Sequence, residues 1–180
     1  MKTFDFEHFQ KDEDFFLQNC NKIFIYPTDT IYGLWSVVNP ESVRKIYEIK
    51  KRDIKKPFSI IAPNVDWIIK NFEVLDNFEN ELNEFLNKYH WITLLLNKKD
   101  KDFLPELWNL SKLWVRILKH PFQNFVAKLW KPFISTSVNL AWQSSAIQVK
   151  DINPEILSQV DLVIDWWKTF GKPSVLIDYS

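Results

Sequence analysis

Glycine is almost missing from this sequence. Only two of its 180 residues are glycine, where average usage of about 7% predicts roughly 13. Tryptophan deviates in the opposite direction, with nine copies. An aromatic-rich core is one explanation, but several tryptophans stand in stretches that otherwise read as polar turns, such as Trp142 in LAWQSS. The two deviations therefore ask for a common explanation.

The sequence also has a single cysteine, no formal net charge and no long apolar run. Cys20 is the only cysteine, which excludes an intramolecular disulfide framework and a cysteine-rich zinc site. Lys+Arg and Asp+Glu both number 23, so overall charge gives no reason to expect nucleic-acid or membrane binding. No apolar run approaches the roughly 20 residues of a membrane-spanning helix, and the acidic N-terminus lacks the apolar segment of a signal peptide. We expect a cytoplasmic protein with no membrane partner.

Strand-like and helix-like segments roughly alternate along the chain, which has a length typical of one domain over residues 1–180. Short β-branched and aromatic runs predict strands at Ile23–Tyr26, Phe58–Ala62, Ile92–Leu96, Leu113–Leu118, Pro132–Thr136, Asp161–Asp165 and Ser174–Asp178. Capping signals and helical spacing predict helices from Asn39, at Asn64–Phe72, Asn77–Tyr89, Pro121–Leu129 and Gln148–Gln159, and short helical turns within Phe4–Asn19. The fold class is α/β (mixed α+β), a twisted mixed sheet flanked by helices.

The stretch from Lys22 to Leu34, KIFIYPTDTIYGL, is the point from which the site is argued. Its apolar strand ends at Pro27, which has no N–H to donate, and a loop rich in hydroxyls follows: Thr28, Asp29, Thr30 and Tyr32. Open α/β sheets usually bind ligands at such strand ends. An Asx or Ser/Thr turn that merely caps the next element is an equal alternative, and capping is the role expected of Asp29.

Cations concentrate in the next part of the chain. Seven basic residues lie between positions 44 and 56: Arg44, Lys45, Lys50, Lys51, Arg52, Lys55 and Lys56. A solvated helix face would explain such a run. A polyphosphate or nucleic-acid site would also explain it, because arginine offers paired donors and lysine a mobile point charge.

Hydroxyls, an amide and one further arginine complete the set of candidates. Ser135, Ser137 and Asn139 lie at or just after the end of the predicted strand Pro132–Thr136, and Ser174 begins the last predicted strand. Arg116 stands inside an apolar strand, where a cation must have a partner. The sequence contains neither a P-loop nor a GxGxxG motif. His8, His90 and His120 lack metal-ligand spacing, so we predict no protein metal site and interpret each as a surface or packing histidine.

In order and spacing, four motifs resemble those of the YrdC-like family, the threonylcarbamoyl-adenylate synthases, in their short, single-domain form. They are PTDTxYGL at 27–34, Lys50-x-Arg52…Lys56-Pro57, Val115-Arg116 and Ser135-Thr136-Ser137-x-Asn139. The resemblance implies a YrdC-like sheet with a concave basic pocket. It also implies an enzyme, a nucleotidyltransferase that makes threonylcarbamoyl-AMP and pyrophosphate from L-threonine, bicarbonate and ATP. The product would serve the N6-threonylcarbamoyl modification of adenosine 37 in tRNA.

The same resemblance implies roles for individual residues. Lys50 and Arg52 would be catalytic, and Arg52, Lys56 and Asn139 would bind ATP. Threonine would lie among Thr30, Arg116, Ser137 and Ser174, with Thr28, Tyr32 and Ser135 as further pocket candidates. Magnesium is expected with ATP, since a metal normally neutralises departing pyrophosphate.

Partners and alternatives follow from the same family. Expected partners are tRNA or double-stranded RNA and the proteins that carry out downstream threonylcarbamoyl transfer. A non-catalytic RNA-binding module of the same fold is the main alternative function. A nucleotide-binding paralogue that makes another product is a third.

The chain departs from the family pattern at its tryptophans and at its end. The family has glycine where Trp35, Trp114, Trp142 and the Trp166-Trp167 pair stand, and Trp130 occupies another expected glycine position. We hypothesise that UGA codons that mean glycine in the source were read as tryptophan. Family members also continue past the last strand with an arginine that reaches ATP, whereas this chain stops at Ser180. We expect truncation or a substitute cation.

Overall fold

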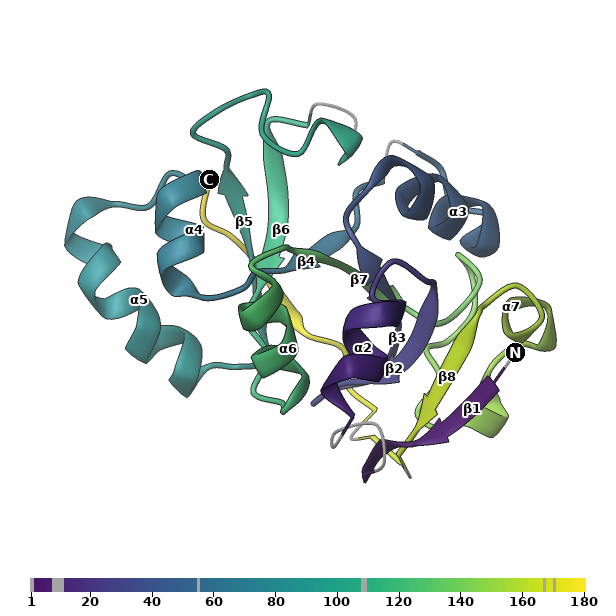
Figure 1. The fold of residues 1–180 in the computed structure, drawn as a ribbon. Helices are drawn as coiled ribbons and strands as arrows, with labels where there is room; N and C mark the ends of the chain where they lie inside the picture. Colours follow the sequence, from purple (N-terminus) through teal and green to yellow (C-terminus); the bar gives the residue numbers. More distant parts are fainter. Residues whose placement is uncertain (1, 8–11, 55, 108–109, 167, 170) are drawn as a thin grey trace.

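The computed structural model describes residues 2–7, 12–54, 56–107, 110–166, 168–169 and 171–180. Within these residues one nine-stranded sheet crosses the molecule in the order β1-β8-β2-β3-β7-β4-β6-β5-β9 (Figure 1). The strands are β1 (Lys2–Asp5), β2 (Phe24–Pro27), β3 (Tyr32–Val37), β4 (Ser59–Ile61), β5 (Ile92–Asn97), β6 (Lys112–Arg116), β7 (Phe133–Ser137), β8 (Leu162–Asp165) and β9 (Val175–Asp178). Four of its neighbouring strand pairs are parallel and four are antiparallel, so the sheet is mixed, as predicted.

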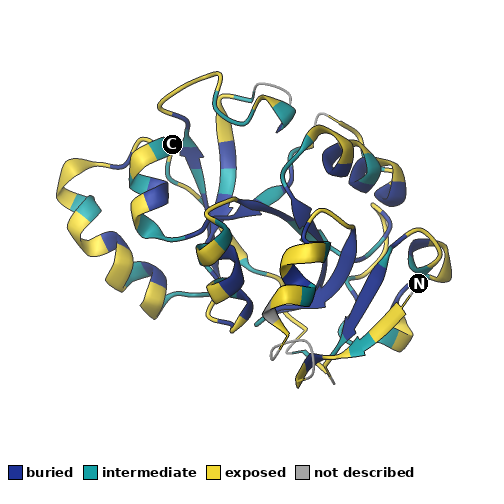
Figure 2. Ribbon diagram, in the orientation of Figure 1, coloured by how far each residue is buried: buried dark blue, intermediate teal, exposed yellow. Residues whose placement is uncertain are grey.

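Helices cover the sheet on two faces. The α-helices are α2 (Glu13–Asn19), α3 (Pro40–Lys50), α4 (Val65–Asn71), α5 (Asp76–Lys88), α6 (Phe122–Leu129) and α7 (Pro154–Leu157), with short 3₁₀ turns at Pro105–Leu107 and Val149–Asp151. One core cluster packs α2 and α6 against the odd-numbered side chains of β3, such as Trp35 and Val37. The other packs α3, α4 and α5 against the even-numbered ones, such as Leu34. This period of two is the ordinary consequence of strand geometry, and Figure 2 shows the buried strands between more exposed helices.

The first turn of α3 shows how the sequence builds an element. Asn39 accepts a hydrogen bond from the Ser42 N–H while the Ser42 hydroxyl accepts one from the Asn39 N–H, and Pro40 occupies the first helical position. Such a capping box satisfies two backbone donors that the helix leaves unpaired. At the other end Lys51 adopts a left-handed conformation with φ 48°, and the Arg52 N–H donates back to the Tyr47 carbonyl (3.2 Å). This closure ends the helix and fixes the direction in which residue 52 leaves it.

The structure corrects the predicted elements in three places. Tyr32–Val37 forms β3, at the centre of the sheet, where no strand was predicted. Lys2–Asp5 forms the edge strand β1, which takes the first two residues of the range Phe4–Asn19, where helical turns were predicted; α2 forms at the end of that range. The predicted helix Gln148–Gln159 is wrong over most of its length, because only a 3₁₀ turn and the four-residue α7 form there. Pro154 stands at the first position of α7, where a missing N–H costs nothing.

The tryptophans occupy contrasting environments. Trp130 ends α6 with φ 53°, in the left-handed region, and is 50% exposed; this is a backbone conformation that glycine favours. Trp142 is also exposed, whereas Trp35 is fully buried in the core. Trp167 lies outside the described residues. The hypothesis that these positions are glycine in the source protein stays a prediction.

No helix in the part of the chain that the structure describes is long and apolar enough to cross a membrane.

Candidate functional site

A cavity of about 300 Å³, which we call the arginine cavity, opens where the strand-end motifs meet. Gly33, Ser135 and Ser137 line it and belong to the paired strands β3 and β7. They continue the odd-numbered rows that pack against α2 and α6, so the cavity lies on that face of the sheet. Gly33 has no room for a side chain, because a Cβ atom there would lie 2.5 Å from the Trp35 Nε1 atom.

Polar groups from seven separate segments converge on the arginine cavity. Ten of its lining residues are polar and lie in strands or in the loops next to them: Thr28, Thr30, Arg52, Ser59, Thr93, Arg116, Ser135, Thr136, Ser137 and Ser174. Two of these are arginines, and none of the described residues that line it carries a carboxylate. A site with this balance favours an anionic ligand that also offers groups for hydroxyl hydrogen bonds.

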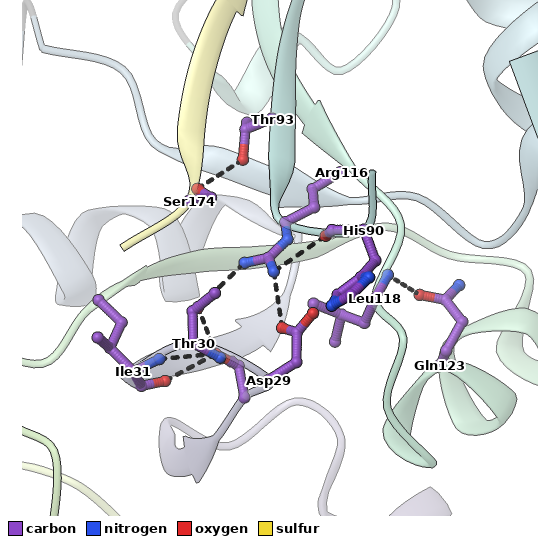
Figure 3. A network of polar contacts seen from close by, with 10 residues as sticks. Asp29, Thr30, Ile31, His90, Thr93, Arg116, Leu118, Gln123 and Ser174 are labelled. Atoms are coloured by element: carbon purple, nitrogen blue, oxygen red, sulfur yellow. Dashed lines mark hydrogen bonds and ion pairs between the residues drawn. The ribbon is translucent and has the colours of Figure 1, made fainter. Parts of the chain in front are cut away.

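Arg116 is the deepest cation of the cavity. Its guanidinium is 7% exposed and its Nη2 donates to Asp29 Oδ1 (2.6 Å) and to the His90 carbonyl (3.2 Å), while its Nη1 donates to Thr30 Oγ1 (3.3 Å). Figure 3 shows these contacts at the two terminal nitrogens of the group. Burial lowers the pKa of Arg116 and the Asp29 charge opposes that shift. The predicted need for a partner is therefore confirmed, and the partner is Asp29.

Asp29 differs from its predicted role as a turn cap. The Thr28 hydroxyl organises the turn instead, since it accepts hydrogen bonds from the N–H groups of Thr30 and Ile31 and donates to the Ile31 carbonyl (2.8 Å). This is a Ser/Thr turn. It leaves the Asp29 carboxylate free to bind Arg116. The sequence offered no signal for that long-range pairing.

Arg116 Nε is buried and has no hydrogen-bond partner among the described residues. An orphaned donor on a buried cation is costly unless a ligand satisfies it. Arg116 thus keeps one donor beyond those that hold it in place. An oxygen of a carboxylate or phosphate is the kind of acceptor that would satisfy this donor most strongly.

Arg52 lies at another part of the cavity and is held from behind. Its Nε donates to the Lys56 carbonyl (3.0 Å) and its Nη2 to the Pro57 carbonyl (3.1 Å), and its guanidinium lies 5.5 Å from the centre of the Phe58 ring. Lys56 itself is exposed and does not line the cavity. Lys55, another member of the basic run, lies outside the described residues.

Lys50 is buried instead of exposed to solvent. Its ammonium donates to the Ser137 carbonyl, to the Asn139 carbonyl (2.8 Å) and to Asn139 Oδ1 (3.2 Å). Burial, followed by the nearby Arg52 charge, lowers the pKa of Lys50 to about 7. Lys50 does not line the cavity. Its hydrogen bonds tie α3 to the loop after β7.

Asn139 and Tyr32 also lie outside the cavity lining. Asn139 accepts a hydrogen bond from the Ser137 hydroxyl (2.5 Å) and donates to the Gln143 carbonyl (2.5 Å), so it closes the loop after β7. The Tyr32 hydroxyl is buried, donates to Asp165 (3.2 Å) and accepts from the Trp166 N–H (2.9 Å). The structure therefore joins Asn139 to the site through Ser137, while it directs the Tyr32 hydroxyl to β8.

Thr93 is a site residue that the sequence analysis missed. Its hydroxyl, fully buried on β5, donates to Ser174 Oγ (2.8 Å), and both residues line the cavity. The polar position inside the apolar run ITLLL was the available signal. Its meaning depends on the parallel pairing of β5 with β9.

A protein-built metal centre does not form in the described part of the chain, where no three His, Cys, Asp or Glu side chains gather with metal-binding geometry. Magnesium in nucleotide sites usually takes one or two carboxylates together with substrate phosphates. The lining of the arginine cavity supplies no such carboxylate. The side chains there do not fit a resident metal ion.

Comparison with known proteins places the chain in a family. The Sua5/YciO/YrdC family model, described as telomere recombination, matches residues 17–180. The chain belongs to this family. A Methanocaldococcus jannaschii protein, provisionally named threonylcarbamoyl-AMP synthase, is 34% identical over 158 residues, which cover 87% of this chain and 73% of that protein.

Two solved structures of the family share the fold. P. abyssi Sua5 complexed with L-threonine has a TM-score of 0.77 at 19% identity, covering 98% of this chain and 53% of that one. E. coli YciO has a TM-score of 0.79 at 19% identity, covering 100% of this chain and 91% of that one. The chain thus spans about half of Sua5 and nearly all of YciO. The predicted family and the predicted YrdC-like fold are both confirmed.

Proposed function

We propose that this chain is a threonylcarbamoyl-AMP synthase that combines L-threonine, bicarbonate and ATP. The observation that carries the proposal is the buried Arg116, whose Nε has no partner among the described residues and which faces a cavity lined with hydroxyls. Support also comes from the M. jannaschii relative's provisional name and from the Sua5 structure complexed with L-threonine. The product is proposed to supply N6-threonylcarbamoylation of tRNA in the cytoplasm, through downstream transfer proteins.

In the proposed reaction the threonine amine first attacks bicarbonate carbon, giving a carbamate and releasing water. A carbamate oxygen then attacks the α-phosphorus of ATP, and the bond to the β-phosphate oxygen breaks to release pyrophosphate. Negative charge gathers in one place throughout, so catalysis rests on positioning and on preorganised donors. Magnesium is proposed to enter with ATP, held by its phosphates, and to neutralise the departing pyrophosphate.

We assign roles to the residues from their charge and from whether they line the arginine cavity. Arg116 is proposed to hold the threonine carboxylate, with Thr30, Ser137 and Ser174 around the rest of the amino acid. Arg52 is proposed to bind the phosphates, and Lys56 to approach them from the exposed side. Lys50 and Asn139 are proposed to act through the loop after β7, because their polar atoms bind that loop and do not line the cavity.

The test is threonine-dependent pyrophosphate release. The purified chain is incubated with L-threonine, bicarbonate and magnesium ATP, and pyrophosphate and the adenylate are measured, the latter by mass spectrometry. Release only when all three substrates are present is the expected result. Absence of release from a folded protein would refute the proposal, and RNA binding without release would favour the non-catalytic alternative.

Arg52→Ala is expected to lower the turnover rate at least about 10²-fold, the usual effect of losing one preorganised donor. The fold should survive, because Arg52 is only half-buried. Arg44→Ala is the matched control, since Arg44 lies on α3 nearby but is exposed and paired with Glu48 (3.3 Å). Near-normal turnover in Arg52→Ala would remove Arg52 from the site.

A further inference from the structure

Four residues form a row across neighbouring strands at the arginine cavity, and they are Ile61, Arg116, Thr93 and Leu176. The register pairs Ile61 of β4 with Arg116 of β6. The β5–β6 register, continued by one residue, places Thr93 opposite Arg116, and β9 pairs Leu176 with Thr93. Residues paired across strands project from the same face of a sheet, and all four line the cavity. The side chain of Thr93 therefore lies on the cavity face, next to Arg116 in the row.

The hydroxyl groups of Thr93 and Ser174 are linked at this point. Thr93 is fully buried and donates to Ser174 Oγ (2.8 Å), as Figure 3 shows. A hydroxyl has a single proton, so the Thr93 proton is committed to this bond. Ser174 lines the cavity and is half-buried, and its own hydroxyl proton has no acceptor among the residues that the structure describes. The pair thus leaves one O–H donor for a ligand.

The Ser137 hydroxyl, which also lines the cavity, has the opposite arrangement. It donates to Asn139 Oδ1 (2.5 Å), so its proton already has an acceptor within the protein. Towards a ligand, Ser137 Oγ can therefore only accept a hydrogen bond while that contact persists. Ser174 and Ser137 are both serines of one cavity, but their neighbours assign them different hydrogen-bond roles.

We propose that Thr93 is a positioning residue that fixes Ser174 as a hydrogen-bond donor to an oxygen of the amino-acid substrate. The inference rests on the proposed function, because it takes L-threonine as the ligand. Oxygens of the carboxylate and of the side-chain hydroxyl can accept the Ser174 proton, whereas a protonated amine has no lone pair to offer. Thr93 acts through Ser174 in this account and makes no bond to the substrate itself.

The expected contribution of Thr93 is one of direction. A hydroxyl without a partner has about three staggered torsional positions, and the bond from Thr93 favours those in which the Ser174 proton points away from Thr93. Loss of this bond should weaken L-threonine binding about threefold. Ser174→Ala removes the donor itself, so it should weaken binding more, about tenfold, which is the effect of one hydrogen bond.

A double-mutant cycle tests the inference. The affinity for L-threonine is measured by isothermal titration calorimetry on the unmodified chain, Thr93→Val, Ser174→Ala and the two combined. Thr93→Val keeps the branched shape and removes only the hydroxyl. It should weaken binding in the unmodified chain and have no further effect in Ser174→Ala, because Thr93 acts only through the missing hydroxyl. Thr93→Ser, which keeps a hydroxyl, should restore binding.

Thermal melts of the same variants separate positioning from packing. Ser174→Ala leaves the buried Thr93 hydroxyl without its acceptor, which is costly. Adding Thr93→Val should therefore raise the melting temperature of Ser174→Ala while leaving its affinity for L-threonine unchanged. Ser36→Ala is the matched control, since it removes another fully buried hydroxyl, one that donates to the Asn21 carbonyl (3.3 Å) from a strand position on the other face of the sheet. It should not change L-threonine binding.

Steady-state kinetics of pyrophosphate release give a third readout. Thr93→Val should raise KM for L-threonine about threefold and leave KM for ATP unchanged, whereas a general distortion of the site would change both.

Three results would overturn the inference: unchanged L-threonine affinity in Thr93→Val, an equal effect of Thr93→Val with and without the Ser174 hydroxyl, or an equal rise of both KM values. Thr93→Ala replaces Thr93→Val in the cycle if the valine variant folds poorly. A chain that binds L-threonine with the expected pattern but releases no pyrophosphate supports the inference and refutes the proposed synthase. A folded chain that does not bind L-threonine refutes both.

Discussion

Removing the carboxylate of Asp29 should destabilise the protein far more than removing a surface carboxylate with an equally short ion pair. In Asp29→Ala the Arg116 cation stays buried, 7% exposed, and keeps only its bonds to the His90 carbonyl and the Thr30 hydroxyl. Breaking a buried pair by removing one partner costs about 3–5 kcal/mol, because the remaining charge is uncompensated.

The two surviving hydrogen bonds place the expected loss at the lower end, about 3 kcal/mol. For a domain of this length each kcal/mol lowers the melting temperature by about 2–4 °C. Asp29→Ala should therefore melt about 6–12 °C below the unmodified chain. Asp29→Asn, which keeps an oxygen that accepts from Arg116 Nη2, should lose less stability than Asp29→Ala.

Glu155→Ala is the matched control. Lys51 and Glu155 lie 2.5 Å apart, as close as the buried pair, but their side chains are 50% and 43% exposed. Exposed pairs contribute at most about 1 kcal/mol. Urea unfolding followed by tryptophan fluorescence, with thermal melts alongside, measures both variants under identical conditions.

Equal losses of stability in Asp29→Ala and Glu155→Ala would refute the reasoning, because burial would then have no effect on how much an ion pair contributes to the free energy of unfolding. A second comparison separates charge from packing. Replacing both partners, as Asp29→Leu with Arg116→Met, should recover much of the stability lost in Asp29→Ala, since no unpaired charge remains. A double variant less stable than Asp29→Ala would contradict that account.

Three further predictions concern the buried lysine and the tryptophans. Folded Lys50 releases its proton near pH 7, while the unfolded chain holds it to about pH 10.5. The free energy of unfolding should therefore rise with pH between these two values. In Lys50→Met, urea unfolding at a series of pH values should show a smaller rise of that free energy. Trp130→Gly should stabilise the fold by about 1 kcal/mol by relieving a left-handed backbone, whereas Trp91→Gly, at a residue without positive φ, should give no gain. Mass spectrometry of the native peptide spanning residues 164–168 should find glycine at position 166, and tryptophan there would end the codon hypothesis.

Local patterns predicted most of the elements because their causes are local. The cap at Asn39, the spacing of apolar residues in α5 and the β-branched runs of β2 and β8 all lie within a few residues of what they produce. Strand β3 was missed because YGLWSV begins inside the polar loop and lacks a clear apolar run. Its extended form comes from pairing with β2 and β7 on its two sides.

The candidate site was likewise predicted in part from the sequence and completed only by the structure. Residue types and spacing predicted that Arg116 would require a partner and that hydroxyls at strand ends would form a polar site. The basic run was open to two interpretations, and the structure separates its members: Lys50 is buried under the loop after β7, Arg52 lines the cavity, and Lys56 is exposed.

By itself the sequence determined where strands end, which residues carry charge or hydroxyls there, and to which family the chain is related. Only the tertiary structure decided that Asp29 pairs with Arg116 and that Thr93 joins Ser174. The reason is sequence separation. The order of the strands in the sheet brings Asp29 and Arg116 together although they lie 87 residues apart, and no local pattern records which distant residue will satisfy a buried charge.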